Sequence, residues 1–144
     1  MKKREWIEEP LYSKIRAAIP IVTVDLLIVQ KDRLLLMKRN NEPAKDEWFT
    51  PGGRIFLGEE IEDTVRRIIE DETGLTPVKI ERKGVMSHIW PNHHTVTIFH
   101  RVNVADDDVR MNEEHRAFKW ISDLNNNLHP CLKEMIKKSE IFGN

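Results

Sequence analysis

Apolar runs separated by short polar breaks fill most of the chain, and their lengths predict its secondary structure. Residues 21–29 are apolar and rich in β-branched side chains apart from Thr23 and Asp25, which is typical of a buried strand. A turn at Lys31 and Asp32 leads into a second strand at 34–37, so the two should form a hairpin. Further strands are expected at 48–49, 77–82, 84–89, 95–104 and 117–121, with a turn at 51–53 and loops at 39–47 and 105–114.

Helical periodicity predicts helices at 8–18, 59–73 and 128–141. The strongest is 59–73, where an apolar stripe runs along one face and Gly74 supplies a C-terminal stop; the stripe consists of Ile61, Val65, Ile68 and Ile69. Strands interleaved with helices predict a mixed α/β or α+β fold. No repeat or linker divides the chain, so residues 1–144 are expected to form one domain.

One acid interrupts the apolar stripe of the 59–73 helix. At about 100° per residue from Ile61, Glu72 lies at about 20°, inside the stripe, and Asp71 lies at its edge near 280°. A carboxylate on a core face is costly unless it is paired or binds a metal. The helix alone leaves three interpretations open: the helix frays before residue 72, Glu72 forms an ion pair with Arg67 or Arg54, or Glu72 and Asp71 form a Mg²⁺ site.

Composition restricts the partners that the chain can have. Hydrophobic residues make up 40% and charged residues 33% of 144 residues, which indicates a soluble globular protein. The net charge of −1 provides no general attraction to nucleic acid or anionic membranes, and no apolar run approaches the roughly 20 residues of a membrane span. Cys131 is the single cysteine, so no internal disulfide forms, which fits the cytoplasm. A cytoplasmic protein with a small-molecule ligand is expected.

Residues 53–75 resemble the signature of the Nudix hydrolase family, G-x5-E-x7-R-E-U-x-E-E-x-G-U, in which U is aliphatic. The matching residues are Gly53, Glu59, Arg67, Ile69, Glu72, Gly74 and Leu75. Ile68 replaces one glutamate of the signature, and Asp71 replaces another by a shorter acid. The resemblance implies an α/β/α sandwich around a mixed sheet and hydrolysis of a nucleoside diphosphate derivative with Mg²⁺ or Mn²⁺. It also implies Glu72 as a metal ligand, with Asp71 and the Gly53 carbonyl as further candidates.

Residues 20–29, 34–54 and 113–121 resemble one branch of this family, the GDP-mannose mannosyl hydrolases. In that branch the position of Ile68 has also lost its acid, and water attacks the anomeric carbon of the sugar while GDP leaves. The resemblance implies His115 as the general base, because a histidine titrates near neutral pH. It offers Glu114 as a weaker metal-ligand candidate. The branch forms homodimers, so a homodimer is expected.

The same resemblance gives roles to four more charged residues and a histidine. The arginines are expected to bind phosphates or steady the metal-binding helix, and an arginine fork suits a diphosphate well; they are Arg39, Arg54 and Arg67. Asp25 and His88 are expected to hold the sugar or the leaving diphosphate. Without the resemblance, His115 is a solvated loop histidine and Asp25 caps a buried arginine. His93 and His94 are expected to be exposed.

Two other functions remain open at the level of sequence. A conventional Nudix pyrophosphohydrolase would cleave a P–O bond in a nucleotide sugar, ADP-ribose or a nucleoside triphosphate, and Asp71 favours it by supplying a second acid. A non-catalytic nucleotide sensor is favoured by the loss of the acid at Ile68. The presence of a base candidate, His115, together with Arg39 and Glu72 argues against the sensor.

Overall fold

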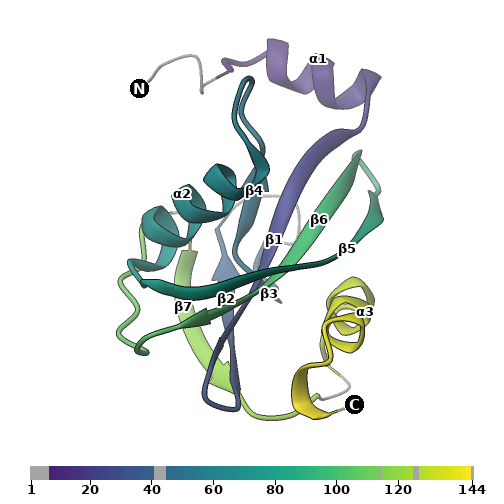
Figure 1. The fold of residues 1–144 in the computed structure, drawn as a ribbon. Coiled ribbons are helices and arrows are strands. Elements are labelled where there is room, and N and C mark those ends of the chain that lie inside the picture. The colour runs from purple at the N-terminus through teal and green to yellow at the C-terminus, as the bar shows by residue number, and fades with distance from the viewer. Residues whose placement is uncertain (1–6, 41–44, 114, 125–126, 144) are drawn as a thin grey trace.

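The computed structural model describes residues 7–40, 45–113, 115–124 and 127–143 (Figure 1). One mixed sheet runs through them in the order β3-β2-β1-β6-β5, with β4 paired to β1 and β7 paired to β2. The strands are β1 Ile21–Gln30, β2 Arg33–Arg39, β3 Trp48–Phe49, β4 Gly52–Arg54, β5 Pro77–Trp90, β6 His93–Val104 and β7 His115–Ile121. The helices are α1 Leu11–Ala18, α2 Ile61–Thr73 and α3 Pro130–Lys138, followed by the 3-10 turn η2 Ile141–Gly143.

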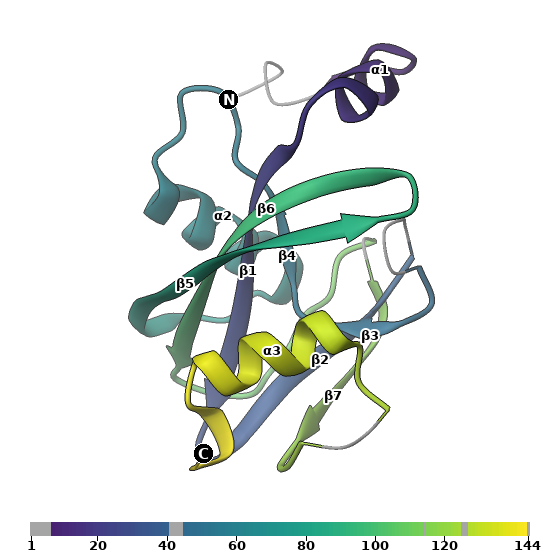
Figure 2. The same ribbon diagram turned by 90° about the vertical axis from the view of Figure 1, so that its right-hand side faces the viewer.

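The sheet has a helix on each face, so the α/β/α sandwich is confirmed (Figures 1 and 2). Strand β1 lies at its centre, parallel to β6 and antiparallel to β2 and β4. Its side chains alternate between the layers, since Leu26 and Ile28 pack with α2 whereas Leu27 and Val29 pack with α3. A strand buried on both faces is apolar at nearly every position, which explains the continuous run in the sequence. Thr23 and Asp25 interrupt this run, and Asp25 lies on the same face of β1 as Leu27 and Val29, which pack with α3.

The best-patterned elements form close to where they were predicted, although α2 begins at Ile61 rather than at 59. The β1–β2 hairpin pairs Val29 with Leu34. Helix α2 buries Val65, Ile68 and Ile69, while its predicted solvent face is exposed. It ends at Gly74, whose φ of 70° is the left-handed conformation that glycine adopts without strain.

Several predicted boundaries are wrong. The turn expected at 51–53 is instead the start of β4, because residues 52–54 pair with β1. The strands expected at 77–82 and 84–89 are one strand, β5, with a register shift between Arg82 and Gly84. A Cβ on Gly84 would lie 2.6 Å from Cζ of Phe99, so the glycine lets the shifted backbone approach that ring.

The bounds of several other helices and strands also differ from prediction. Helix α1 begins at Leu11 rather than at 8, with Pro10 at its N-cap position. The helix expected at 128–141 divides into α3 and η2. Strand β7 begins at His115, two residues before the predicted start, and β2 extends through Arg39. Within the described ranges, no helix is long and apolar enough to cross a membrane.

Candidate active site

Glu72 is buried beside a histidine from the sheet. Only 7% of Glu72 is exposed, and its Oε1 lies 3.6 Å from Nε2 of His115, the first residue of β7. Strand pairing between β2 and β7 places Arg39 opposite His115, at a register shift after Lys38. The register of two strands and the last turn of α2 therefore bring together three residues that are far apart in sequence. His115 is 4% exposed and is not the solvated loop histidine of the alternative interpretation.

The charge state of His115 follows from its surroundings. Burial, and then the positive charge of Arg39, lower the pKa of His115 to about 4. The nearby carboxylate of Glu72 favours the protonated ring, but the net direction is a lowered pKa. The imidazole is therefore neutral at pH 7, and a neutral imidazole has one nitrogen that can accept a proton.

Arg67 binds the loop that precedes α2. Its guanidinium lies 2.8 Å from Oε2 of Glu59 and donates to the carbonyl of Arg54 at 2.9 Å. Glu59 also accepts from the amide of Phe56 and the hydroxyl of Thr64. Burial acts to raise the pKa of Glu59, but these hydrogen bonds outweigh it and lower the pKa to about 2. Arg67 thus connects the loop to the helix.

Ile68 fills the position where the Nudix signature has a glutamate. Its side chain is 2% exposed and belongs to the apolar cluster between α2 and the sheet. Cδ1 of Ile68 lies 3.3 Å from the position that a Cβ on Gly53 would occupy, so it packs beneath β4. Asp71 is exposed, in contrast to Glu72. Among the acids of α2, Glu72 is therefore the one that is buried.

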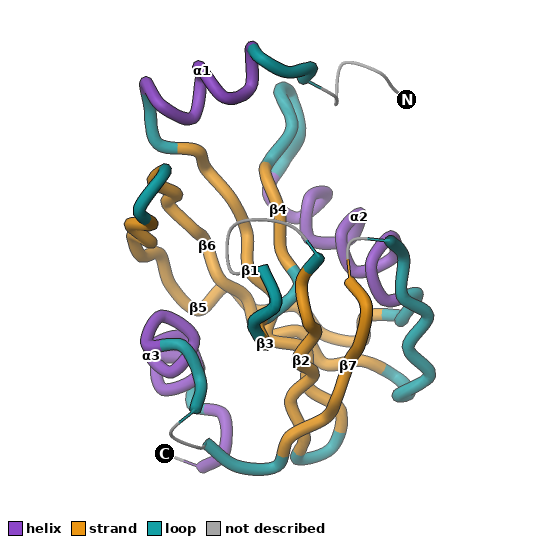
Figure 3. Tube along the Cα trace, turned by 180° about the vertical axis from the view of Figure 1, so that it is seen from behind, coloured by secondary structure: helices purple, strands orange, loops and turns teal. Residues whose placement is uncertain are grey.

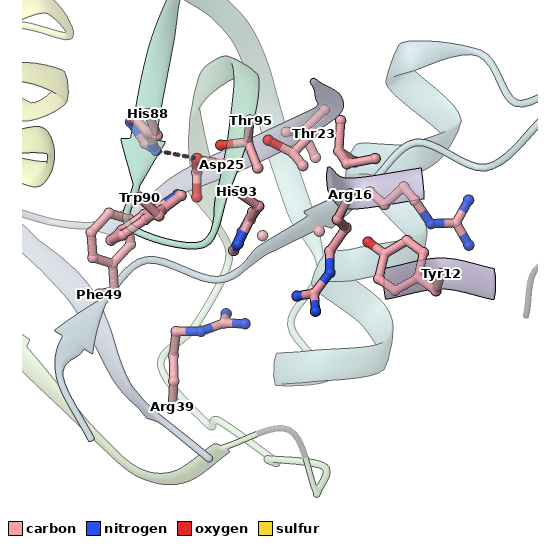
Figure 4. Close-up of a pocket in the computed structure, with 15 residues that line it drawn as sticks. Tyr12, Arg16, Thr23, Asp25, Arg39, Phe49, His88, Trp90, His93 and Thr95 are labelled. Carbon is pink, nitrogen blue, oxygen red and sulfur yellow. Dashed lines mark ion pairs between the residues drawn. The ribbon is translucent and has the colours of Figure 1, made fainter. Parts of the chain in front are cut away.

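A pocket of about 170 Å³ is lined by residues of α1 and of strands β1 to β6, and Glu72 and His115 are not among them (Figure 4). All four predicted substrate-binding residues line it, together with Gly53; the four are Asp25, Arg39, Arg54 and His88. Figure 4 shows Phe49 and Trp90 on one side, Tyr12 and Arg16 of α1 on the other, and Arg39 approaching from below. The pocket is lined by three arginines and one carboxylate, which gives it an excess of positive charge.

Asp25 lines this pocket and is held in place by hydrogen bonds. The hydroxyl of Thr97 donates to its Oδ2 at 2.6 Å and that of Thr50 to its Oδ1 at 3.2 Å. Nδ1 of His88 lies 4.0 Å from Oδ2. Burial raises the pKa of Asp25 and lowers that of His88, while their mutual attraction opposes both shifts. The hydrogen bonds of Asp25 are therefore with two threonines, while the positive charges of His88 and Arg39 act to lower its pKa.

The predicted residues fall into two adjoining groups. Asp25, Arg54 and His88 line the pocket, whereas Glu72 and His115 lie beside it. Arg39 joins the two groups, because it lines the pocket and pairs with His115. Gly53 joins them again, because it lines the pocket and contacts Ile68 of α2. Glu114 lies outside the described residues.

The sequence did not indicate several residues that line the pocket. They are Tyr12, Arg16, Phe49, Trp90, His93 and Thr95, with Ile21, Thr23, Val24 and Gly52. His93 and His94 are half-buried, not exposed as predicted. Tyr12 and Arg16 lie four residues apart, which places them on one face of a helix. That spacing was visible in the sequence, but nothing there indicated that α1 lies against β6.

A divalent metal would find a limited set of protein ligands at this site. No group of three or more His, Cys, Asp or Glu side chains is placed to hold a metal within the described part of the chain. Mg²⁺, however, is commonly bound by one or two carboxylates, with waters and substrate phosphates completing its shell. The buried carboxylate of Glu72 next to an arginine-lined pocket fits that pattern, and the Gly53 carbonyl is a further candidate ligand.

Comparisons with known proteins agree on one family. The model of the NUDIX domain matches residues 20–137. The Low-salt glycan biosynthesis protein Agl8 of Haloferax volcanii is 31% identical over 139 residues, covering 90% of this chain and 88% of that protein. An ADP-ribose pyrophosphatase of Methanocaldococcus jannaschii is 33% identical over 128 residues, covering 88% and 72%. The crystal structure of a MutT NUDIX hydrolase from Burkholderia pseudomallei superposes with a TM-score of 0.75 at 28% identity, covering 83% and 98%.

Proposed function

Because this chain belongs to the Nudix family of hydrolases, we propose that it hydrolyses a nucleotide sugar by attack at the anomeric carbon, with GDP-mannose as the preferred candidate. The observation that carries this proposal is the pair of Glu72 and His115 beside the apolar Ile68. Attack at phosphorus generally relies on several carboxylates that hold metals or activate water. Here α2 buries one carboxylate, and a histidine lies next to it.

In the proposed reaction each residue of the site has a separate role. His115 accepts a proton from the attacking water, while Arg39 and Arg54 bind the diphosphate and neutralise charge that develops on the leaving group. Asp25 and His88, on the pocket floor, bind sugar hydroxyls or the near phosphate. Glu72 would hold Mg²⁺ or Mn²⁺ with the Gly53 carbonyl, and a metal bound there would add positive charge beside the diphosphate.

The name of one relative supports a sugar-containing substrate. The Haloferax volcanii protein is a glycan biosynthesis protein, and it aligns with nearly the whole chain. The choice of GDP and mannose rests on the stretches at 20–29, 34–54 and 113–121 that resemble the sugar-cleaving branch.

A second candidate function is cleavage of a P–O bond in ADP-ribose or another nucleotide derivative. It is favoured by the relative from Methanocaldococcus jannaschii, which is an ADP-ribose pyrophosphatase. Asp71 provides a second acid on α2, but its exposed position weakens that support.

The products in ¹⁸O-labelled water distinguish the two reactions. GDP and free mannose, with the label in the sugar, are expected from GDP-mannose and Mg²⁺. GMP and mannose 1-phosphate, with the label in a phosphate, would overturn attack at carbon. Preferential hydrolysis of ADP-ribose to AMP and ribose 5-phosphate would support the second candidate. Binding without turnover, across a panel of nucleoside diphosphate derivatives with Mg²⁺ or Mn²⁺, would indicate a sensor.

A further inference from the structure

Helix α1 forms one wall of the pocket, although it lies outside the part of the chain that matches the family model. The match covers 20–137, whereas α1 spans Leu11–Ala18. Tyr12 and Arg16 project from this helix and line the pocket with Arg54 (Figure 4). The family resemblance therefore assigns these two side chains no role, and their role must be argued from their surroundings.

Tyr12 lies near two guanidinium groups. The guanidinium carbon of Arg16 is 5.4 Å from the centre of the Tyr12 ring, and that of Arg54 is 5.8 Å from it. Arg54 is also 4.7 Å from the ring of Phe56, over which Arg67 lies at 3.5 Å. Within about 6 Å an aromatic face attracts a cation. A series of arginines and aromatic rings thus runs from α1 to α2, with Arg54 held between Tyr12 and Phe56.

Polar atoms of the pocket wall are buried without hydrogen bonds to the described residues. They are Nε of Arg16, Nε1 of Trp90 and Nε2 of His88. Buried polar groups in native proteins nearly always have a partner. The first two are obligatory donors, so they need acceptor atoms. Their position in one pocket indicates an acceptor-rich ligand.

Charge narrows the kind of ligand further. Among the described residues that line the pocket, Asp25 is the single acid and already accepts from two threonines. The pocket is also lined by three arginines, Arg16, Arg39 and Arg54, so positive charge exceeds negative charge there. A diphosphate carries both negative charge and several acceptor oxygens, and guanidinium groups match phosphate geometry.

We propose that α1 is part of the substrate site: Arg16 binds the diphosphate of a nucleotide ligand, and Tyr12 positions Arg54 for the same group. This proposal deepens the proposed function and rests on it for the diphosphate, but not for the bond that breaks. Arg16 is a specificity residue in this scheme, because it favours ligands with two phosphates over those with one. Tyr12 is a positioning residue that acts through Arg54.

Calorimetric titration of the full chain with GDP, GMP and inorganic pyrophosphate tests the proposal without turnover. Arg16→Ala should weaken GDP and pyrophosphate binding by about 10- to 100-fold, the usual range for a lost hydrogen bond to a charged group. Tyr12→Ala removes the aromatic face beside Arg54 and should weaken the same binding by about 2- to 30-fold, the range for a lost cation–π contact. GMP binding should change much less. Tyr12→Phe keeps the ring and should restore the affinity that Tyr12→Ala loses. Lys14→Ala removes a positive charge from the exposed side of the same helix, outside the pocket, and should change affinity by less than about threefold.

Three results would overturn the proposal. They are unchanged diphosphate binding in Arg16→Ala, an equal loss in Lys14→Ala, and wild-type protein that binds neither GDP nor pyrophosphate. Thermal unfolding of each variant separates a binding defect from a loss of structure, and Arg16→Gln repeats the test if Arg16→Ala fails to fold. P–O cleavage by a protein whose diphosphate affinity still depends on Arg16 would refute the proposed reaction while leaving this inference intact.

Discussion

At the scale of single residues, His115 is the side chain on which the proposed chemistry depends most. His115→Gln retains a hydrogen-bonding side chain of similar size but cannot act as a base at neutral pH. Turnover of the nucleotide sugar should fall by roughly 10²-fold or more, while nucleotide affinity changes little, because general base catalysis acts in the transition state. Steady-state kinetics beside GDP titrations measure both effects. His94→Gln, at a half-buried histidine outside the pocket of Figure 4, is the control, and an unchanged rate in His115→Gln would remove His115 from this role.

Glu72 makes a separate prediction about the metal. Glu72→Gln should abolish Mg²⁺-dependent turnover and weaken Mn²⁺ binding measured by electron paramagnetic resonance, because an amide is a poor ligand for a hard cation. The helix should stay folded, since Val65, Ile68 and Ile69 hold it to the sheet. Glu70→Gln removes an exposed carboxylate from the same helix and serves as the control.

Asp71→Asn decides whether the second acid takes part. Because Asp71 is exposed, its loss should have little effect on Mn²⁺ binding. Normal activity of Glu72→Gln at low Mg²⁺ would contradict the metal assignment, and a strong effect of Asp71→Asn would restore the two-acid site that a conventional pyrophosphohydrolase uses.

At the scale of elements, the loop before α2 depends on one ion pair. Glu59 is 14% exposed and its pKa is lowered to about 2 from an ordinary value of 4.5. Its ionised form therefore stabilises the folded state fully above pH 4.5, and this contribution is lost as the pH falls from 4.5 towards 2. Glu59→Gln should lower the free energy of unfolding by about 2–3 kcal/mol at pH 7.

Denaturant unfolding of wild type and Glu59→Gln between pH 7 and pH 3 measures this dependence. The two curves should converge as the pH decreases. Glu62→Gln breaks an exposed ion pair with Arg66 on the same helix and should cost less than about 1 kcal/mol throughout. A difference between wild type and Glu59→Gln that stays constant over this range would show that charge on Glu59 is not the cause.

Predictability also differs from one element to another. Helix α2 and the β1–β2 hairpin follow from local patterns, because their apolar periods agree with their burial. Strand β4 was missed because Pro51 and two glycines favour a turn, while pairing with β1 across the sheet overrides that preference. The break predicted between Arg82 and Gly84 is a register shift within β5, where Gly84 approaches Phe99 of the neighbouring strand. Tertiary pairing decides such cases, and a single sequence does not display it.

The same limit applies to the candidate site. Glu72 was recognisable because a carboxylate on an apolar stripe contradicts the pattern of the helix around it. Asp25 was recognisable for the same reason in its strand. Arg16 and Trp90 contradict nothing in their own segments, since an arginine on a helix and a tryptophan in a strand are ordinary there. Their position in the pocket depends on how α1 and the β5–β6 hairpin approach each other, which is visible only in the fold (Figure 3).

At the scale of the whole molecule, the proposed site is assembled from segments that are far apart in the sequence, from α1 (Leu11–Ala18) to β7 (His115–Ile121). The pocket draws residues from α1 and from six strands, β1 to β6, and Arg39 of β2 links it to β7 by pairing with His115. A ligand that binds there contacts elements that are otherwise joined mainly through the sheet. The homodimer implied by the family resemblance remains a prediction, and it would be tested by sedimentation with and without ligand.

Ligand binding should therefore stabilise the entire fold, and the part of the stabilisation that depends on the metal should be separable from the part that depends on the arginines. GDP with Mg²⁺ at about 100 times its dissociation constant should add about 2.7 kcal/mol to the free energy of unfolding, because the folded state alone binds it. GDP without metal should stabilise wild type less at the same concentration, through the arginines.

In Glu72→Gln the stabilisation by GDP alone should persist while the increment from Mg²⁺ disappears. In Arg16→Ala the increment from Mg²⁺ should persist while the stabilisation by GDP alone decreases. Thermal unfolding of the three proteins at several concentrations of GDP, with and without Mg²⁺, measures the stabilisation by GDP alone and the increment from Mg²⁺. If either variant lost both the stabilisation by GDP alone and the increment from Mg²⁺, Glu72 and the arginines would not act as separate parts of one site.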